Sequence, residues 1–290
     1  MTIIVGIICD DAIVLASDSQ TTTGTVKRCD TDKIGVVAFA NVNVLVAQSG
    51  YETFSGQAVD VLCGLAKDKE ITNYRMVAEL AEQAMRQLKD KVRFQQGDCT
   101  MEELRDFVWK HELGCELMMA YYYEGRPYIF TIDMIVGVAN RVNSFYTAIG
   151  CGGSLGSYLL SEYAMSSMLS DYAATISVFV VDKVKNHDAY CGGDTKLGII
   201  YRLDPARSEI ETILRDKFGD DKGSYIEIFT QEQIRELSDI TNSVEVSTKT
   251  EQHEKFKKAL LERMKKRWAK FKADRQKALT QATMPNTKTD

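Results

Sequence analysis

The stretch Thr2-Ile-Ile-Val-Gly-Ile-Ile8, followed after a short gap by Ala12-Ile-Val-Leu-Ala-Ser-Asp18, decides how this chain folds. Both segments are short, mostly apolar runs rich in Ile and Val, a pattern typical of strands that are buried on both faces. Asp10-Asp11 lies between the runs and favours a hairpin turn. Residues 3–8 and 12–17 are therefore predicted to form two paired strands in the core.

Further strands and helices follow in alternating blocks along the chain. In the segment 74–92, apolar residues recur every four positions, which predicts an amphipathic helix. Blocks of paired strands separated by helices predict an α+β fold, namely a four-layer α/β/β/α sandwich with helices on both outer faces. The remaining strands are predicted over residues 34–39, 43–48, 115–123, 127–133, 142–149, 195–202 and 208–213, and the other helices over 51–68, 101–111, 153–169 and 171–186. Thr21 to Gly24 is predicted to be a polar loop.

Composition narrows the classes to which the protein can belong. Hydrophobic residues make up 44% of the 290 residues, enough for a full core. No apolar run reaches the roughly 18 residues of a membrane span, and no signal peptide is apparent, so we expect a cytoplasmic protein. The seven cysteines include no CxxC pair, and the three histidines (111, 187 and 253) lie far apart. No metal site or cofactor is therefore expected.

The C-terminal segment differs from the rest of the chain in charge. Residues 255–277 carry a net charge of +9, whereas the whole chain carries −5. We expect a main domain over residues 2–215, with an insertion at about 92–112, and a basic helical extension over 216–290 that contains helices at 231–243 and 250–281. The last helix has three interpretations: packing on its own body or a neighbouring subunit, binding an acidic partner or nucleic acid, or lying on an anionic membrane. No nucleic-acid-binding motif is present, so nucleic acid is not the expected partner.

Thr2 is the leading candidate for a nucleophile. A threonine hydroxyl reacts only when a base removes its proton, and an N-terminal threonine carries its own base in the α-amine, whose reference pKa is about 7.7–8.0. Removal of Met1, which is general before a small second residue, would expose that amine. Lys33 is the candidate cation to tune the hydroxyl and the amine, and Asp18 could hold it. Lys27 is the second choice for the cation.

These residues and two distant turns resemble the proteasome β-type subunits and bacterial HslV. That family begins its mature chain with a catalytic Thr, has an apolar strand that ends in Ala-x-Asp, and has a Lys leading into a strand. Ala148-Ile-Gly150-Cys151-Gly152 is similar to its Gly-Ser-Gly turn, and Asp188-Ala-Tyr-Cys191-Gly-Gly193 to its Asp-Ala-Tyr-Ser-Gly-Gly segment. The resemblance implies the N-terminal nucleophile hydrolase fold and a bacterial or archaeal homologue with a C-terminal extension.

The resemblance also implies roles for individual residues. It makes Thr2 the nucleophile of a threonine-type endopeptidase, with Lys33 tuning it, Asp18 orienting Lys33, and Asp188 in the surrounding network. Cys151 and Cys191 stand where the family usually has serines. The same resemblance places the oxyanion hole at Ser49 or Gly50, and substrate contacts at Thr21, Thr22, Thr23 and Tyr51.

The implied partners are a peptide or protein substrate and further copies of the chain, since the family works as oligomers that enclose their sites. The tail could change a standard ring into a dimer-based or open assembly. The residues do not decide whether an ATPase acts as a partner. Two other functions stay open: an N-terminal nucleophile amidohydrolase or transpeptidase with a specific substrate, and a catalytically inactive assembly scaffold.

Overall fold

The computed structural model describes residues 2–23, 26–97, 99–111, 113–202 and 224–242, and two five-stranded antiparallel sheets form its centre. The first sheet has the strand order β10-β1-β2-β11-β12 and the second has the order β5-β6-β7-β8-β9. The first sheet consists of β10 (Tyr146–Ile149), β1 (Ile4–Ile8), β2 (Ala12–Asp18), β11 (Thr195–Arg202) and β12 (Ser224–Ile228). The second consists of β5 (Ile34–Ala38), β6 (Asn43–Gly50), β7 (Cys115–Tyr123), β8 (Arg126–Asp133) and β9 (Ala139–Arg141).

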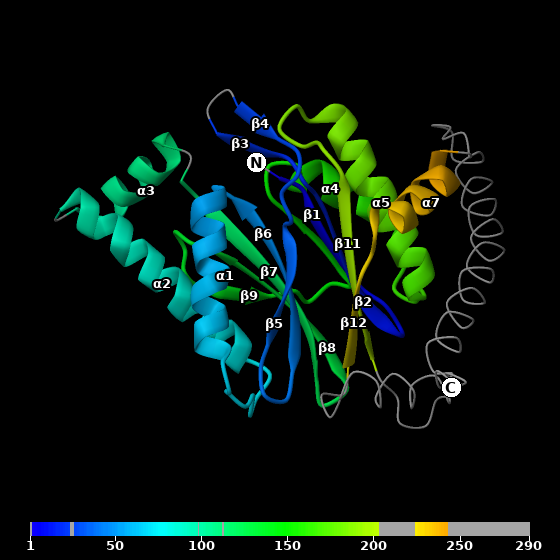
Figure 1. Cartoon of the computed structure of the whole chain (residues 1–290), viewed down its shortest axis with the longest axis horizontal. Coiled ribbons are helices and arrows are strands. Elements are labelled where there is room, and N and C mark those ends of the chain that lie inside the picture. The colour runs from blue at the N-terminus through cyan, green and yellow to red at the C-terminus, as the bar shows by residue number, and fades with distance from the viewer. Residues whose placement is uncertain (1, 24–25, 98, 112, 203–223, 243–290) are drawn as a thin grey trace, which may run out of the picture.

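Helices cover the outer faces of the two sheets, as Figure 1 shows. The first sheet carries α4 (Gly153–Tyr163), α5 (Ser170–His187) and α7 (Gln231–Asn242), and the second carries α1 (Glu52–Ala66) and α2 (Met76–Gln96), with α3 (Met101–Lys110) beside α2. The predicted α/β/β/α sandwich is therefore confirmed. None of the helices in the described ranges is long and apolar enough to cross a membrane.

The alternation of side chains along the N-terminal strand explains why the sheets are stacked. Ile3, Val5 and Ile7 pack against the helices that cover the first sheet. Ile4 packs with residues of the second sheet in the layer between the two sheets. Because successive side chains point to opposite faces, a strand that is apolar at every position needs cover on both sides, and the two-sheet sandwich supplies it.

Two local predictions were wrong. The run 142–149 was expected to be one strand, but β9 ends at Arg141 in the second sheet and β10 begins at Tyr146 in the first. Asn143-Ser144 lies between the two strands, and these turn-forming residues interrupt the apolar pattern where the chain crosses between sheets. Residues 21–24 were expected to be a loop, but β3 (Thr21–Thr23) pairs with β4 (Val26–Arg28), because threonine is a good strand former despite its hydroxyl.

Residues 224–242 fall in the expected C-terminal extension, which was predicted to begin at 216. Strand β12 pairs with β11 along the edge of the first sheet. Ile234 and Leu237 of α7 are buried in the same apolar cluster as α5. The described part of the expected extension thus packs against the sandwich. The strand expected at 208–213 and the basic helix expected at 250–281 lie outside the described residues.

Candidate functional site

The site forms where β1 begins and β2 ends, beside the loops that precede α4 and follow α5. Asp18, the last residue of β2, is fully buried. Its Oδ1 accepts hydrogen bonds from the Ile3 backbone N–H (3.2 Å) and from Lys33 Nζ (2.8 Å), and its Oδ2 accepts one from the Gly192 N–H (2.9 Å). Partners from three separate parts of the chain hold the carboxylate in one orientation.

Lys33 connects Asp18 to Thr2. Its Nζ donates to Thr2 Oγ1 (2.6 Å), to Asp18 Oδ1 and to the backbone carbonyl of Gln20. The side chain is 3% exposed, and burial lowers the pKa of the ammonium, whereas the Asp18 carboxylate acts in the opposite direction. An ammonium has three N–H donors, so all three are used here and the cation is fixed next to the hydroxyl.

Thr2 is 1% exposed and is held by the turn that precedes α4. Its backbone N–H donates to Cys151 Sγ (3.2 Å), and its carbonyl oxygen accepts from the Gly152 N–H (3.2 Å). Gly150 has a φ of +87°, and a Cβ at that position would lie 2.2 Å from the Thr2 carbonyl oxygen. Only glycine can adopt this backbone and approach so closely, which accounts for the glycine in the predicted turn.

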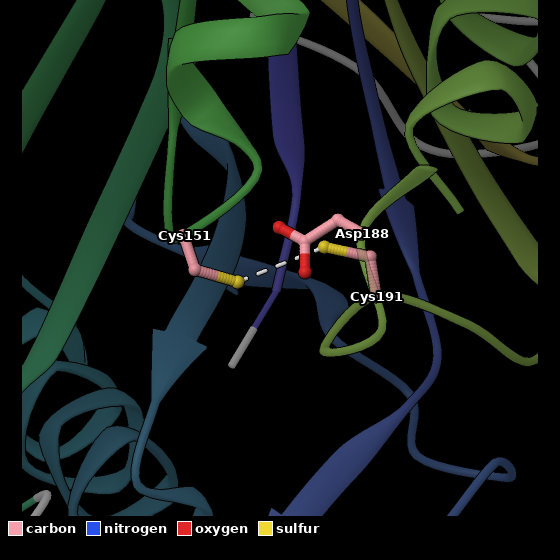
Figure 2. A group of neighbouring side chains, drawn as sticks. All are labelled: Cys151, Asp188 and Cys191. Carbon is pink, nitrogen blue, oxygen red and sulfur yellow. Dashed lines mark hydrogen bonds between the residues drawn. The ribbon is translucent and has the colours of Figure 1, made fainter. Parts of the chain in front are cut away.

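Figure 2 shows a cluster formed by Cys151, Cys191 and Asp188, whose Cys151 Sγ accepts the hydrogen bond from the Thr2 N–H. The two Sγ atoms are 3.7 Å apart, and both sulfurs and an Asp188 carboxylate oxygen lie within 4.8 Å of one another. The hydrogen bond between the thiols lowers the pKa of Cys151 and raises that of Cys191. Of the two thiols, Cys151 is therefore the easier to deprotonate.

The other predicted residues lie around this centre with less direct contact. Ser49 is buried, and its Oγ is 3.0 Å from the position that a Gly150 Cβ would occupy. Gly50 has a φ of +97°, and a Cβ there would lie 2.1 Å from the Gly114 carbonyl oxygen. Tyr51 precedes α1, and its N–H donates to the same carbonyl.

The predicted substrate loop is an ordered part of the fold. Thr21 is buried, and its Oγ1 lies 3.3 Å from that of Thr31. The backbones of Thr22 and Thr23 pair with Lys27 and Val26 of β4. Lys27, the second choice for the cation, is exposed and donates to the Ala189 carbonyl (2.7 Å).

Two contacts of this centre were not expected from the sequence. The Gln20 carbonyl receives a hydrogen bond from Lys33, and a main-chain acceptor leaves no mark in a sequence. Glu116 of β7 accepts a hydrogen bond from the Gly150 N–H (2.9 Å), and burial raises the pKa of its carboxyl group. An acidic residue inside an otherwise apolar strand was the available signal for Glu116.

A family model now adds to this geometry. The model described as "Proteasome subunit" matches residues 2–200. The chain belongs to the proteasome subunit family. The matched range covers both sheets except for β12 and the last two residues of β11, and it includes all the residues of the centre around Thr2. The resemblance inferred from the sequence is confirmed at the level of the family.

Solved structures of Anbu proteins share the fold of this proteasome-family chain. Anbu (ancestral beta-subunit) from Yersinia bercovieri aligns with a TM-score of 0.59 and 16% identity, over 83% of this chain and 93% of that one. An Anbu (Gly-1) mutant from Hyphomicrobium sp. strain MC1 aligns with a TM-score of 0.55 and 16% identity, over 76% and 94%. At this identity the likeness shows the fold alone. No curated protein matches the chain significantly in sequence.

Proposed function

We propose that this protein is a proteasome-like threonine-type peptidase whose nucleophile is Thr2, exposed as the N-terminal residue when Met1 is removed. The observation that carries the proposal is the contact of 2.6 Å between Lys33 Nζ and Thr2 Oγ1, together with the 2.8 Å ion pair between Lys33 and Asp18. A buried cation fixed against a hydroxyl favours its deprotonated form. The membership in the proteasome subunit family supports hydrolase chemistry of the N-terminal nucleophile type.

The reaction proceeds in two halves. Thr2 Oγ attacks the carbonyl carbon of a peptide bond while the hydroxyl proton passes to the α-amine of Thr2, directly or through water. The tetrahedral intermediate expels the amine half of the substrate, which takes that proton, and an ester to Thr2 remains. Water then attacks the ester, its proton passes to the α-amine and on to the leaving Oγ, and the carboxylic acid product is released.

The hydrogen bonds of Lys33 determine where the hydroxyl proton of Thr2 can go. Because Lys33 donates to Oγ1, the oxygen uses a lone pair on this side and its own proton must point elsewhere. The Thr2 nitrogen belongs to the same residue and becomes the nearest base once Met1 is absent. Lys33 thereby stabilises the developing alkoxide without competing for the proton.

The pairing of β6 favours Gly50 over Ser49 as the oxyanion-hole donor. The Gln48 N–H points toward β5 and donates to the Lys33 carbonyl (2.9 Å), whereas the Tyr51 N–H points toward β7 and donates to the Gly114 carbonyl (2.9 Å). Successive N–H groups of a strand point to opposite edges. Gly50 is two residues after Gln48, so its N–H is expected on the same edge of β6 as that of Gln48, which faces Lys33. A backbone donor on that side is suited to the oxygen of a carbonyl attacked by Thr2.

The edge of β3 is suited to hold an extended substrate. Within the described residues, β3 (Thr21–Thr23) pairs with β4 alone, so its other edge has no strand partner. A peptide can add to such an edge through main-chain hydrogen bonds. Thr21 directly follows Gln20, whose carbonyl binds Lys33, so a peptide on this edge would lie close to the nucleophile. Tyr51, beside the proposed oxyanion donor, would contribute to the substrate pocket.

Turnover of fluorogenic peptides tests the proposal, with intact mass spectrometry to report whether Met1 has been removed. Thr2→Ala should abolish turnover and Thr2→Ser should retain part of it, while both variants keep the thermal stability of the parent. Equal turnover by Thr2→Ala, or retention of Met1 in an active protein, would rule out the nucleophile. Ligation in place of hydrolysis would favour the transpeptidase alternative, and turnover of a small amide alone would favour the amidohydrolase.

Membership in the proteasome subunit family also supports a proposal for the location and the oligomeric state of the enzyme. We propose a cytoplasmic homo-oligomer, because proteasome-type subunits generally enclose their sites by assembly. Light scattering coupled to size exclusion measures the oligomeric state directly. A strictly monomeric and active protein would contradict this part of the proposal.

A further inference from the structure

A cluster of three possible metal ligands lies next to the nitrogen of Thr2, which serves as the base in the proposed mechanism. The cluster consists of Cys151, Asp188 and Cys191. Cys151 lies in the turn before α4, and Asp188 and Cys191 lie in the loop after α5 (Figure 2). Their ligand atoms lie within 4.8 Å of one another, and the Thr2 nitrogen lies 3.2 Å from Cys151 Sγ. Two sulfurs and one carboxylate are therefore close enough to share an ion, and the Thr2 nitrogen lies next to one of the sulfurs.

The spacing of the two sulfurs matches that of ligands on one metal ion. Two sulfurs at about 2.3 Å from a zinc ion and at the tetrahedral angle lie about 3.8 Å apart. The observed distance is 3.7 Å, so the sulfurs need no displacement to share an ion. Gly152 helps to make room, because a Cβ at this position would lie 3.0 Å from Cys191 Sγ.

The chemistry of the donors selects the class of ion. Thiolates prefer thiophilic ions such as Zn²⁺, Co²⁺ and Cd²⁺ over Mg²⁺ and Ca²⁺. Cys191 is 3% exposed and Cys151 is the more exposed of the two, so an ion would enter from the Cys151 side.

We propose that Cys151, Cys191 and Asp188 form a binding site for a thiophilic divalent cation of the Zn²⁺ class, with the free α-amine of Thr2 as its fourth ligand. On binding, the two thiols and the protonated amine release their protons to solvent, and four metal–ligand bonds replace them. The ion occupies the lone pair of the amine, so the amine cannot accept the proton of the Thr2 hydroxyl. The inhibition that follows rests on the proposed peptidase function, whereas the binding does not.

Cobalt titration under reducing conditions tests the binding without any need for activity. One Co²⁺ per chain should give a sulfur-to-cobalt charge-transfer band, and Zn²⁺ should displace it. Cys151→Ser and Cys191→Ser should each weaken binding by at least tenfold, and Asp188→Asn should weaken it to a smaller degree. Cys63→Ser is the matched control, because Cys63 is an exposed free cysteine on α1 and should leave the band unchanged.

The fourth ligand is tested by keeping Met1 in place. Thr2→Gln prevents removal of Met1, so the nitrogen stays an amide and the affinity for Co²⁺ should fall. Circular dichroism melting curves of the variants show whether a lost band reflects a lost fold. Absence of a charge-transfer band in the folded parent, or a band that survives both cysteine substitutions, would overturn the proposal.

The outcomes separate this site from the proposed function. Peptidase activity that Zn²⁺ abolishes and a chelator restores, at the concentrations that fill the site, supports both. A charge-transfer band in a protein without peptidase activity keeps the site and removes the proposed function. Peptidase activity without metal binding, or binding that leaves peptidase activity unchanged, refutes the inhibitory site and leaves the proposed function intact.

Discussion

Replacement of Lys33 by methionine removes the contact on which the proposed mechanism depends most. The Lys33 ammonium lies 2.6 Å from Thr2 Oγ1 and 2.8 Å from the Asp18 carboxylate, and both side chains of the ion pair are almost completely buried. A hydrogen bond to a charged group contributes about 1.5–3 kcal/mol. If that energy is lost from the transition state, kcat/KM falls about 10- to 150-fold, since about 1.4 kcal/mol corresponds to a factor of ten.

The same substitution also affects stability. Removing one partner of a buried ion pair typically costs about 3–5 kcal/mol, because the other charge stays buried without its counterion. For a domain of this size the expected fall in Tm is about 6–20 °C. Activity must therefore be measured well below the Tm of the variant.

A double variant separates the two effects. In Lys33→Met/Asp18→Asn the unpaired charge is gone, while the asparagine oxygen can still accept from the Ile3 N–H. We expect this variant to regain part of the lost stability and none of the lost activity. Lys27→Met is the comparison for the choice of cation and should retain most of the activity. The reasoning is refuted if Lys33→Met loses stability but keeps its kcat/KM, or if the double variant regains both.

Three further expectations follow from individual contacts. In a pH–rate profile, activity should rise with pH as the α-amine deprotonates and fall again when the Lys33 ammonium, whose pKa is lowered by burial, loses its proton. Asp18→Asn should move this alkaline fall to lower pH, because the Asp18 carboxylate raises the pKa of Lys33. Gly150→Ala should abolish activity and lower the Tm, since its Cβ would lie 2.2 Å from the carbonyl of the nucleophile, whereas Gly64→Ala, in open space on α1, should stabilise the helix by about 0.5–1 kcal/mol. Leu237→Ala in α7 should lower the free energy of unfolding by about 2–5 kcal/mol in urea titrations if residues 224–242 belong to the body; an unchanged value in any of these measurements contradicts the corresponding contact.

The fold could be predicted from the sequence because its central strands are apolar at every position. Such strands must be covered on both faces, which limits the arrangement to stacked layers. The passage from β9, which ends at Arg141 in the second sheet, to β10, which begins at Tyr146 in the first, could not be predicted in the same way. Strand-like residues lie on both sides of Asn143-Ser144, where the chain crosses from one sheet to the other. The periodicity of apolar residues alone does not show at which residue the chain leaves one sheet and joins the next.

The residues around Thr2 could be predicted only where a side chain makes the contact and its place next to a predicted strand can be recognised in the sequence. Asp18 and Lys33 stand at the end and the beginning of predicted strands, and the structure places both at Thr2. The contribution of Gln20 is a main-chain carbonyl, which any residue can supply. The choice between Ser49 and Gly50 depends on which edge of β6 each N–H faces, a property of the pairing register and not of residue type.

The cluster of Cys151, Asp188 and Cys191 shows a different limit of sequence reasoning. Metal sites are usually recognised by ligands at short, regular spacing, whereas Cys151 and Asp188 are 37 positions apart in the sequence. The sequence consequently indicated no metal site, although both cysteines were expected near the nucleophile. The ligands meet because the turn before α4 and the loop after α5 meet at Thr2.

Reaction with a peptide epoxyketone tests the central claim most directly. The reagent requires a hydroxyl, which adds to its ketone, and a free amine on the same residue, which opens its epoxide. Peptide mapping by mass spectrometry should find the adduct on an N-terminal peptide that begins with Thr2, and the adduct should be absent or strongly reduced in Lys33→Met. An unmodified Thr2, in protein from which Met1 has been removed, would contradict the account.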